Sequence, residues 1–103
     1  KVAHMVPALN AIGIEASCFG NHDFDFGLET LETYAAQCNF PWIISNCIDK
    51  HTKKPLGNGL TTHTFTWAGR KIGLMGLIER EWLVTLGTIS LDEVFVLNFF
   101  SFF

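Results

Sequence analysis

The sequence predicts an α/β fold in the order helix, strand, helix, strand, followed by a β-hairpin. Apolar residues recur at helical spacing in residues 2–12 and again in residues 28–38. Each of these segments precedes a short apolar run, residues 14–19 and residues 42–45, of the length expected for a buried strand. Residues 61–78 show strand-like alternation and a tight turn, which is typical of a hairpin. Helices that alternate with short apolar strands favour parallel strands covered by helices.

The first helix is expected over residues 2–12 and is followed by a strand. Pro7 lies inside the helical pattern and would kink it, unless the helix begins close to residue 6. Gly13 follows the last apolar turn, where a glycine commonly adopts a left-handed conformation and ends the helix. Residues 14–19 then form a short, mostly buried strand, which Gly20 ends.

The second helix is expected over residues 28–38, with Leu31 and Tyr34 on its apolar face. Glu29 lies near its N-terminal end, where the helix dipole favours an acid. The second strand, residues 42–45, follows Pro41.

A polar loop, residues 49–60, separates this unit from the predicted hairpin. Residues 61–67 alternate threonines with His63, Phe65 and Trp67, which predicts a half-exposed strand. A tight turn at Ala68-Gly69-Arg70 leads into a partner strand that ends at residue 78.

The C-terminal segment differs in composition from the rest. Residues 1–90 are interpreted as a fragment of a catalytic domain, and residues 91–103 as an apolar tail of uncertain origin. The tail carries no charge after Glu93 and would be prone to aggregation if it were exposed. The preferred interpretation is that it is foreign to the domain, and the alternative is a buried strand.

Charge and composition exclude several classes of protein. The formal charge of −3 and the scattered basic residues argue against a nucleic-acid-binding surface, which needs clustered Lys and Arg. The nearest approach to a basic patch is Lys50, Lys53 and Lys54, which we interpret as a solvated loop face. No stretch reaches the ~20 apolar residues that a membrane-spanning helix requires. The sequence does not predict a compartment.

The cysteines, Cys18, Cys38 and Cys47, are odd in number and lack paired CxxC spacing. A zinc ribbon or a disulfide scaffold is therefore disfavoured, and free thiols are expected. Cys18 is expected to be an inert core residue of the first strand.

The candidate chemistry lies between the first strand and the second helix, in the string Gly-Asn-His-Asp-Phe-Asp-Phe-Gly, residues 20–27. Parallel α/β sheets bind ligands beyond the carboxyl ends of their strands, and this loop leaves a strand at that end. Asn21 offers a carboxamide oxygen, a hard neutral ligand for a divalent metal. His22 is suited to proton transfer or charge stabilisation, and a neighbouring carboxylate from Asp23 or Asp25 would fix its tautomer.

This string resembles the GNH(D/E) signature of the calcineurin-like metallophosphoesterases. Its full length resembles the 5′-nucleotidase branch of that superfamily, in which GNHEFDxG is typical. Residues 1–10, 40–46 and 70–78 are similar to the helix before the motif, the strand after it and a later hairpin strand of the same branch. The resemblance covers roughly residues 1–87 and implies a partial metallophosphoesterase sandwich.

The resemblance also implies a mechanism and a cofactor. Two divalent metal ions, drawn from Mn, Zn, Fe, Mg or Co, would hold a hydroxide that attacks the phosphorus of a small-molecule phosphomonoester, a nucleotide among the candidates. Asn21 would bind the second metal, His22 would stabilise the phosphoryl group or protonate the leaving oxygen, and Asp25 would orient His22. Asp23 is the second choice for that orienting role, and Asn46, at the end of the second strand, is a candidate for lining the pocket.

The chain departs from the family pattern in ways that limit this prediction. Relatives carry a DxH and a GDxxD motif upstream and a GHxH motif downstream, and none of these is found at the corresponding place here. Asn21 is the only expected metal ligand, so the isolated chain should be inactive. Activity would belong to a parent protein that supplies the rest of the catalytic domain and a C-terminal domain. A non-catalytic binding or scaffold relative, and a truncated product without function, are the alternatives.

Overall fold

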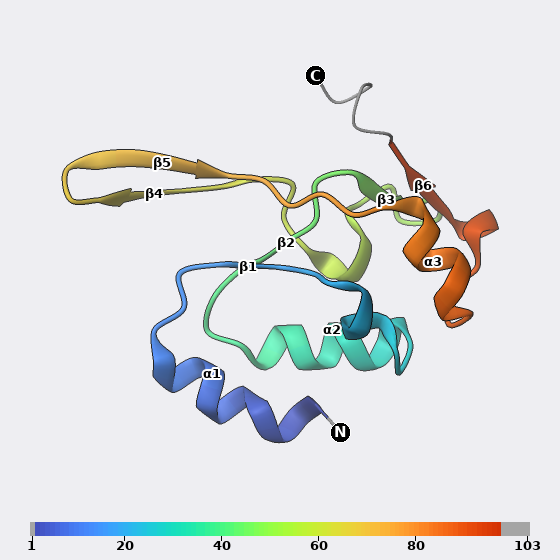
Figure 1. Cartoon of the computed structure of the whole chain (residues 1–103), viewed down its shortest axis with the longest axis horizontal. Helices are drawn as coiled ribbons and strands as arrows, with labels where there is room; N and C mark the ends of the chain where they lie inside the picture. The colour runs from blue at the N-terminus through green and yellow to red at the C-terminus, as the bar shows by residue number, and fades with distance from the viewer. Residues whose placement is uncertain (1, 98–103) are drawn as a thin grey trace.

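The structure is a computed structural model that describes residues 2–97 (Figure 1). The N-terminal part comprises a 3₁₀ turn η1 (Val2–Met5), α1 (Val6–Ile12), β1 (Ser17–Cys18), a 3₁₀ turn η2 (Asn21–Phe24), α2 (Leu28–Gln37) and β2 (Trp42–Ile43). It is followed by β3 (Cys47–Asp49), η3 (Leu56–Asn58), β4 (His63–Trp67), β5 (Arg70–Leu74), α3 (Arg80–Leu86), η4 (Leu91–Glu93) and β6 (Val94–Val96). No helix within residues 2–97 is both long and apolar enough to span a bilayer.

The first predicted helix is divided at its proline. A 3₁₀ turn covers residues 2–5, and the α-helix begins at Val6 with Pro7 in its first turn, where the missing N–H costs no hydrogen bond. Gly13 ends α1 with a φ of 84°, which confirms the left-handed glycine. The Asn10 side chain donates to the Gln37 carbonyl at 3.0 Å and accepts from the Asn39 N–H at 2.8 Å. These contacts tie α1 to the end of α2.

The two predicted strands pair in parallel, with Ser17 opposite Trp42 and Cys18 opposite Ile43. This confirms the parallel arrangement, although the regular strands are shorter than residues 14–19 and 42–45. The chain stays buried from residue 42 to residue 47 because further segments pack against β2. Leu60, for example, accepts a hydrogen bond from the Ile44 N–H and donates to the Trp42 carbonyl.

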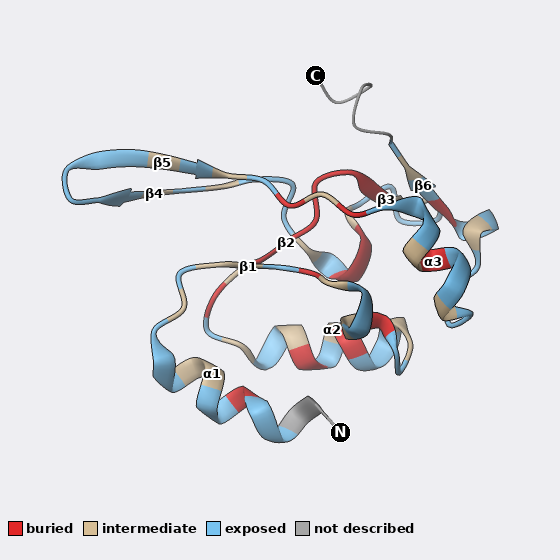
Figure 2. Cartoon of the chain, in the orientation of Figure 1, coloured by how far each residue is buried: buried red, intermediate tan, exposed pale blue. Residues whose placement is uncertain are grey.

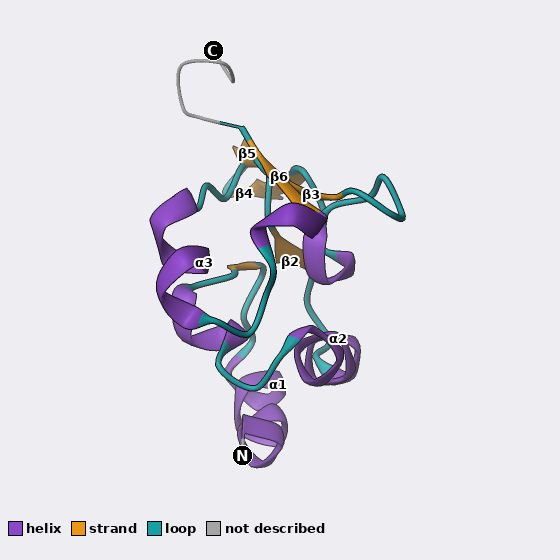
Figure 3. Ribbon diagram, turned by 90° about the vertical axis from the view of Figure 1, so that its right-hand side faces the viewer, coloured by secondary structure: helices purple, strands orange, loops and turns teal. Residues whose placement is uncertain are grey.

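The hydrophobic core lies between α2 and the parallel strands, where buried residues gather in Figure 2. Leu31 and Tyr34 are buried on the predicted face of α2. Trp42 stacks on Phe19 with ring centroids 4.9 Å apart and lies 5.6 Å from the Tyr34 ring. In Figure 3, α2 is seen end-on below the strands, and α3 lies to one side of them.

Cys18 is a correction to the prediction, since it was expected in the core and is exposed. Successive side chains of a strand point to opposite faces, so the burial of Phe19 turns the preceding side chain outward. Cys18, Cys38 and Cys47 are all free thiols, as expected.

The predicted hairpin is confirmed by the antiparallel pairing of β4 with β5, with Trp67 opposite Arg70, although its regular strands begin at His63 and end at Leu74 and do not extend to residues 61 and 78. Ala68 and Gly69 form its two-residue turn with φ values of 50° and 77°, the sign that a type I′ turn requires. The hairpin projects from the body of the molecule in Figure 1. Trp67, near its tip, is 70% exposed.

The described part of the tail is folded against the body. β6 pairs antiparallel with β3, and Val94 is buried, whereas Phe95 is half-exposed beneath the ammonium groups of Lys50 and Lys53. Within this stretch, residues 94–96 form a strand, as in the alternative prediction, but only Val94 of that strand is buried, and residues 91–93 form the 3₁₀ turn η4. The phenylalanine-rich end, residues 98–103, lies outside the described residues, and the division of the chain at residue 90 stays a prediction.

Candidate active-site segment

The motif begins where β1 ends, at the carboxyl end of the parallel pair. The Phe19 N–H donates to the Ile43 carbonyl as the last sheet contact, and η2 begins two residues later. Gly20 precedes η2 with a φ of −104°, a conformation that other residues also adopt. Gly27 has a φ of 88° and a ψ of 165°, a conformation that strongly favours glycine, and it leads directly into α2.

Phe24 anchors the motif to the core. Its side chain is completely buried, and its carbonyl accepts a hydrogen bond of 2.7 Å from the Thr88 hydroxyl. Sequence reasoning missed Thr88, because nothing local indicates that a residue 64 positions away contacts the motif. Phe26, two residues further on, is 59% exposed. The motif is therefore held to the core mainly by Phe24, through its buried ring and its carbonyl oxygen.

His22 and Asp25 form the polar pair that the sequence predicted. His22 Nδ1 lies 2.9 Å from Asp25 Oδ2, across one turn of the 3₁₀ segment. This contact requires a proton on Nδ1 and leaves Nε2 of a neutral ring as the free acceptor. The His22 side chain is 83% exposed, so its outer nitrogen can reach a molecule in solution. Asp25 therefore contacts the imidazole and does not cap α2, which begins without a side-chain cap.

Asp23 has a different part in the loop. Its carboxylate accepts a hydrogen bond of 2.8 Å from the Gly20 N–H, so it closes the 3₁₀ turn and does not bind His22. Burial raises the pKa of Asp23, and the Gly20 N–H opposes that shift by stabilising the charged form. The second-choice orienting role of Asp23 is not supported by this geometry.

Asn21 is the one predicted metal ligand, and it is exposed at the start of η2. Within residues 2–97 its side chain makes no hydrogen bond, so its oxygen is free to bind a cation. The described residues hold no cluster of three or more His, Cys, Asp or Glu side chains that could bind a metal. One neutral carboxamide is a poor donor set, so these residues do not form a metal site by themselves.

Asn46 is buried at the end of the second strand, and both polar atoms of its carboxamide make hydrogen bonds within the chain. Its Nδ2 donates to the carbonyls of Ile78 and Leu97, and its Oδ1 accepts from the Ile78 N–H, all at 2.9 Å. Ser45 makes a similar link, because its hydroxyl accepts from the Gly76 N–H at 2.9 Å. Asn46 also lines an open pocket of about 410 Å³. It therefore joins three segments, and its predicted role in the active site stays a prediction.

One flank of this pocket comes from the segment between β5 and α3 and from the start of α3. Glu79, Arg80 and Glu81 line it beside Ile78. The other histidines are separate: His51 is exposed in a turn, and His63 lies 3.4 Å from Glu15 at the base of the hairpin.

The chain is similar to parts of several known nucleotidases and phosphoesterases. No protein-family model matches the chain. A 5′-nucleotidase from Vibrio cholerae is 39% identical over 73 residues, which are 71% of this chain and 13% of that protein. A 2′,3′-cyclic-nucleotide 2′-phosphodiesterase/3′-nucleotidase from Salmonella typhimurium is 41% identical over 49 residues, 48% of this chain and 8% of that protein. A calcineurin-like phosphoesterase from Bacillus subtilis superposes with a TM-score of 0.75 over 92% of this chain and 30% of its own, at 18% identity.

These comparisons confirm the resemblance drawn from the sequence. The fold is that of part of a calcineurin-like phosphoesterase, and the homologues are nucleotidases. The chain spans only 8–13% of the length of the curated relatives that it matches. Calcineurin-like phosphoesterases generally depend on two metal ions.

Proposed function

We propose that the chain is the His-bearing segment of a metal-dependent phosphoester hydrolase that acts on a nucleotide phosphomonoester. The observation that carries this proposal is the contact between His22 and Asp25 at the carboxyl end of β1. It is supported by the nucleotidases from Vibrio and Salmonella, which act on nucleotides according to their names.

In this proposal His22 and Asp25 handle charge and protons at the phosphoryl group. Asp25 holds the Nδ1–H of the ring, so Nε2 faces outward. A protonated Nε2 can stabilise charge on a phosphoryl oxygen or give its proton to the leaving alkoxide. The carboxylate beside it stabilises the imidazolium form during that step.

Asn21 would contribute one oxygen to a metal ion whose remaining donors lie outside this chain. The described residues contain no cluster that could bind the metal without that help. The identity of the metal is left open. On these grounds the isolated chain should show no hydrolysis, and the complete active site would need further residues of a longer protein.

The test compares two histidine variants in a full-length protein that carries this segment. His22→Asn should lower kcat for release of phosphate from a nucleoside 5′-monophosphate by about 100-fold or more, since general acid–base groups contribute ~10²–10⁴-fold. His51→Asn is the matched control, because His51 is exposed in a turn away from the motif and should leave kcat unchanged.

Two results would contradict the proposal. One is a full-length protein that binds nucleotides and divalent metal but hydrolyses none, which would favour the binding or scaffold alternative. The other is an equal effect of both substitutions on kcat.

A further inference from the structure

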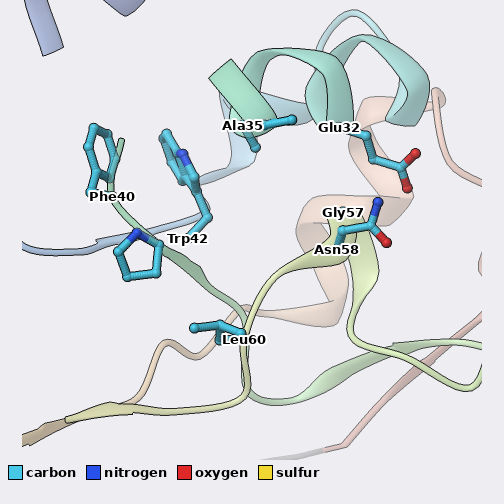
Figure 4. A pocket seen from close by; sticks show the side chains of 9 residues that line it. Glu32, Ala35, Phe40, Trp42, Gly57, Asn58 and Leu60 are labelled. Carbon is cyan, nitrogen blue, oxygen red and sulfur yellow. The ribbon is translucent and has the colours of Figure 1, made fainter. Parts of the chain in front are cut away.

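The pair formed by His22 and Asp25 is not positioned by the walls of a pocket. No residue of the motif lines the pocket of about 320 Å³ between α2 and β2 (Figure 4), and none lines the pocket beside Asn46. The pair is therefore positioned by the hydrogen bonds of the motif and by the residues that contact the motif from outside. Among residues 2–97, the one side chain outside the motif that hydrogen-bonds to it is that of Thr88, just beyond α3.

The peptide unit that joins Phe24 to Asp25 is hydrogen-bonded at both of its polar ends. Its oxygen accepts from the Thr88 hydroxyl at 2.7 Å and from the Gly27 N–H at 3.1 Å. Its N–H donates to the His22 carbonyl at 3.3 Å. Because a peptide unit is planar, bonds at both ends fix the orientation of the whole plane. That orientation sets the direction in which the Asp25 side chain leaves the backbone.

The bond from Thr88 is the shortest of these three. Its length is typical of a good O–H···O hydrogen bond, whereas the other two are at or beyond the long end of the usual N–H···O range. It is also the one that comes from another element of the fold. Without the Thr88 hydroxyl, the peptide unit would depend on two long bonds made by its own neighbours in the chain.

Thr88 is itself held by its neighbours. α3 ends at Gly87, whose φ of 67° stops the helix directly before Thr88. Leu83 of α3 is 1% exposed, and Ile89, the residue after Thr88, is also buried in the core. The backbone is thus anchored on both sides of Thr88, so its hydroxyl is in place before any substrate binds.

We propose that Thr88 is a positioning residue for His22 and Asp25. Its hydroxyl fixes the peptide unit before Asp25, so that the carboxylate meets Nδ1 of His22 at 2.9 Å and keeps the proton on that nitrogen. The consequence for catalysis rests on the proposed function. There, a misdirected Nε2 would be less effective at the phosphoryl group, since a displacement of about 1 Å can cost ~10²-fold in rate.

The first test measures the tautomer of His22 in the 103-residue chain, labelled with nitrogen-15 at histidine. In mildly alkaline buffer, where imidazole rings are neutral, nitrogen NMR distinguishes a proton on Nδ1 from a proton on Nε2. The unchanged chain should carry the His22 proton mainly on Nδ1. Thr88→Val removes the hydroxyl at nearly constant shape and should shift this population toward Nε2–H.

Two further variants isolate the hydroxyl. Thr88→Ser keeps it and should keep the Nδ1–H tautomer. Thr85→Val is the matched control, because the Thr85 hydroxyl donates to the Trp82 carbonyl of its own helix at 2.9 Å. Thr88→Val should still fold, since the Gly27 N–H continues to satisfy the Phe24 carbonyl, and a cooperative urea melt checks this.

The second test measures the release of phosphate from a nucleoside 5′-monophosphate by a full-length protein that carries this segment. Thr88→Val should lower kcat by about 10-fold and leave KM within about 2-fold, because Thr88 acts through His22 and does not touch the substrate. Thr88→Ser should retain most of kcat, and Thr85→Val should match the unchanged protein.

Several results would overturn the proposal. In the nitrogen spectra these are an unchanged tautomer in Thr88→Val, an equal shift in Thr88→Ser or Thr85→Val, or an unchanged chain with the His22 proton on Nε2. Loss of cooperative unfolding in Thr88→Val would also overturn it, because the hydroxyl would then maintain the whole fold. So would an active full-length protein whose kcat does not respond to Thr88→Val.

Failure of the proposed function gives a different result. A full-length protein that releases no phosphate, with or without these substitutions, would refute the hydrolase activity alone. The nitrogen spectra of the 103-residue chain would still decide whether Thr88 positions His22, because the tautomer is read without any reaction.

Discussion

The buried carboxamide of Asn46 gives the sharpest test of how this chain is held together. Its three hydrogen bonds link the end of the second strand to Ile78 and to Leu97. Asn46→Asp keeps the shape of the side chain but replaces its two N–H donors with an oxygen. The carbonyls of Ile78 and Leu97 then lose their donor and face a carboxylate instead.

The expected cost follows from these contacts. A buried polar group left without a partner costs about 1–3 kcal/mol, and two carbonyls are affected, so we expect a loss of about 3–5 kcal/mol at neutral pH. A chain of this size has a total stability of about 5–15 kcal/mol, so the variant would be close to unfolding. The new carboxyl group is buried, and its folded-state pKa is therefore raised above the unfolded value. Stability should then fall as pH rises through the acidic range, because the folded state binds the proton more tightly.

The assay is urea unfolding at acidic and at neutral pH, followed by tryptophan fluorescence. Asn58→Asp is the matched control, because Asn58 is exposed and its side chain makes no hydrogen bond within residues 2–97. It should change stability by less than about 0.5 kcal/mol. The reasoning would be refuted if Asn46→Asp cost no more than the control at neutral pH, or if its cost did not decrease in acid.

Three further substitutions test other contacts. Gly76→Ala would place a Cβ atom on the Cys18 sulfur, so it should lower stability by about 1–3 kcal/mol, and Cys18→Ala should recover part of that loss in a thermal melt. Asp23→Asn keeps an acceptor for the Gly20 N–H but removes a carboxyl group whose pKa burial has raised. That carboxyl group costs stability as pH rises through its raised pKa, so the advantage of the variant in urea should grow from acidic to neutral pH and then level off. Trp42→Phe removes a buried indole N–H that has no acceptor within residues 2–97. The free energy of unfolding, measured from the urea midpoint, should therefore fall by only about 1–2 kcal/mol, less than for a tryptophan whose N–H is hydrogen-bonded. A loss as large as that of Trp42→Ala would contradict this.

Much of the fold could be predicted because its signals are local. The period of α2 in residues 28–38, the left-handed Gly13 and the turn at Ala68-Gly69 each depend on a few neighbouring residues. The contact between His22 and Asp25 is also local, since both residues belong to one turn.

The exposure of Cys18 and of Phe26 could not be predicted, because hydrophobic character alone does not show which face of a segment packs inward. Burial is decided by the segments that pack against it, and those come from distant parts of the chain. The burial of Leu56 in the polar loop is a similar case, since it belongs to the hydrophobic core.

The sequence by itself determined the order of helices and strands, the position of the motif after a parallel strand and the pairing of its histidine with Asp25. The tertiary structure alone decided that Thr88 holds the motif and that Asn46 joins three segments. The physical reason is the range of the interactions. Helical periodicity and turns are set by bonds between close neighbours, whereas these contacts join residues 32 to 64 positions apart, whose meeting depends on how the whole chain packs.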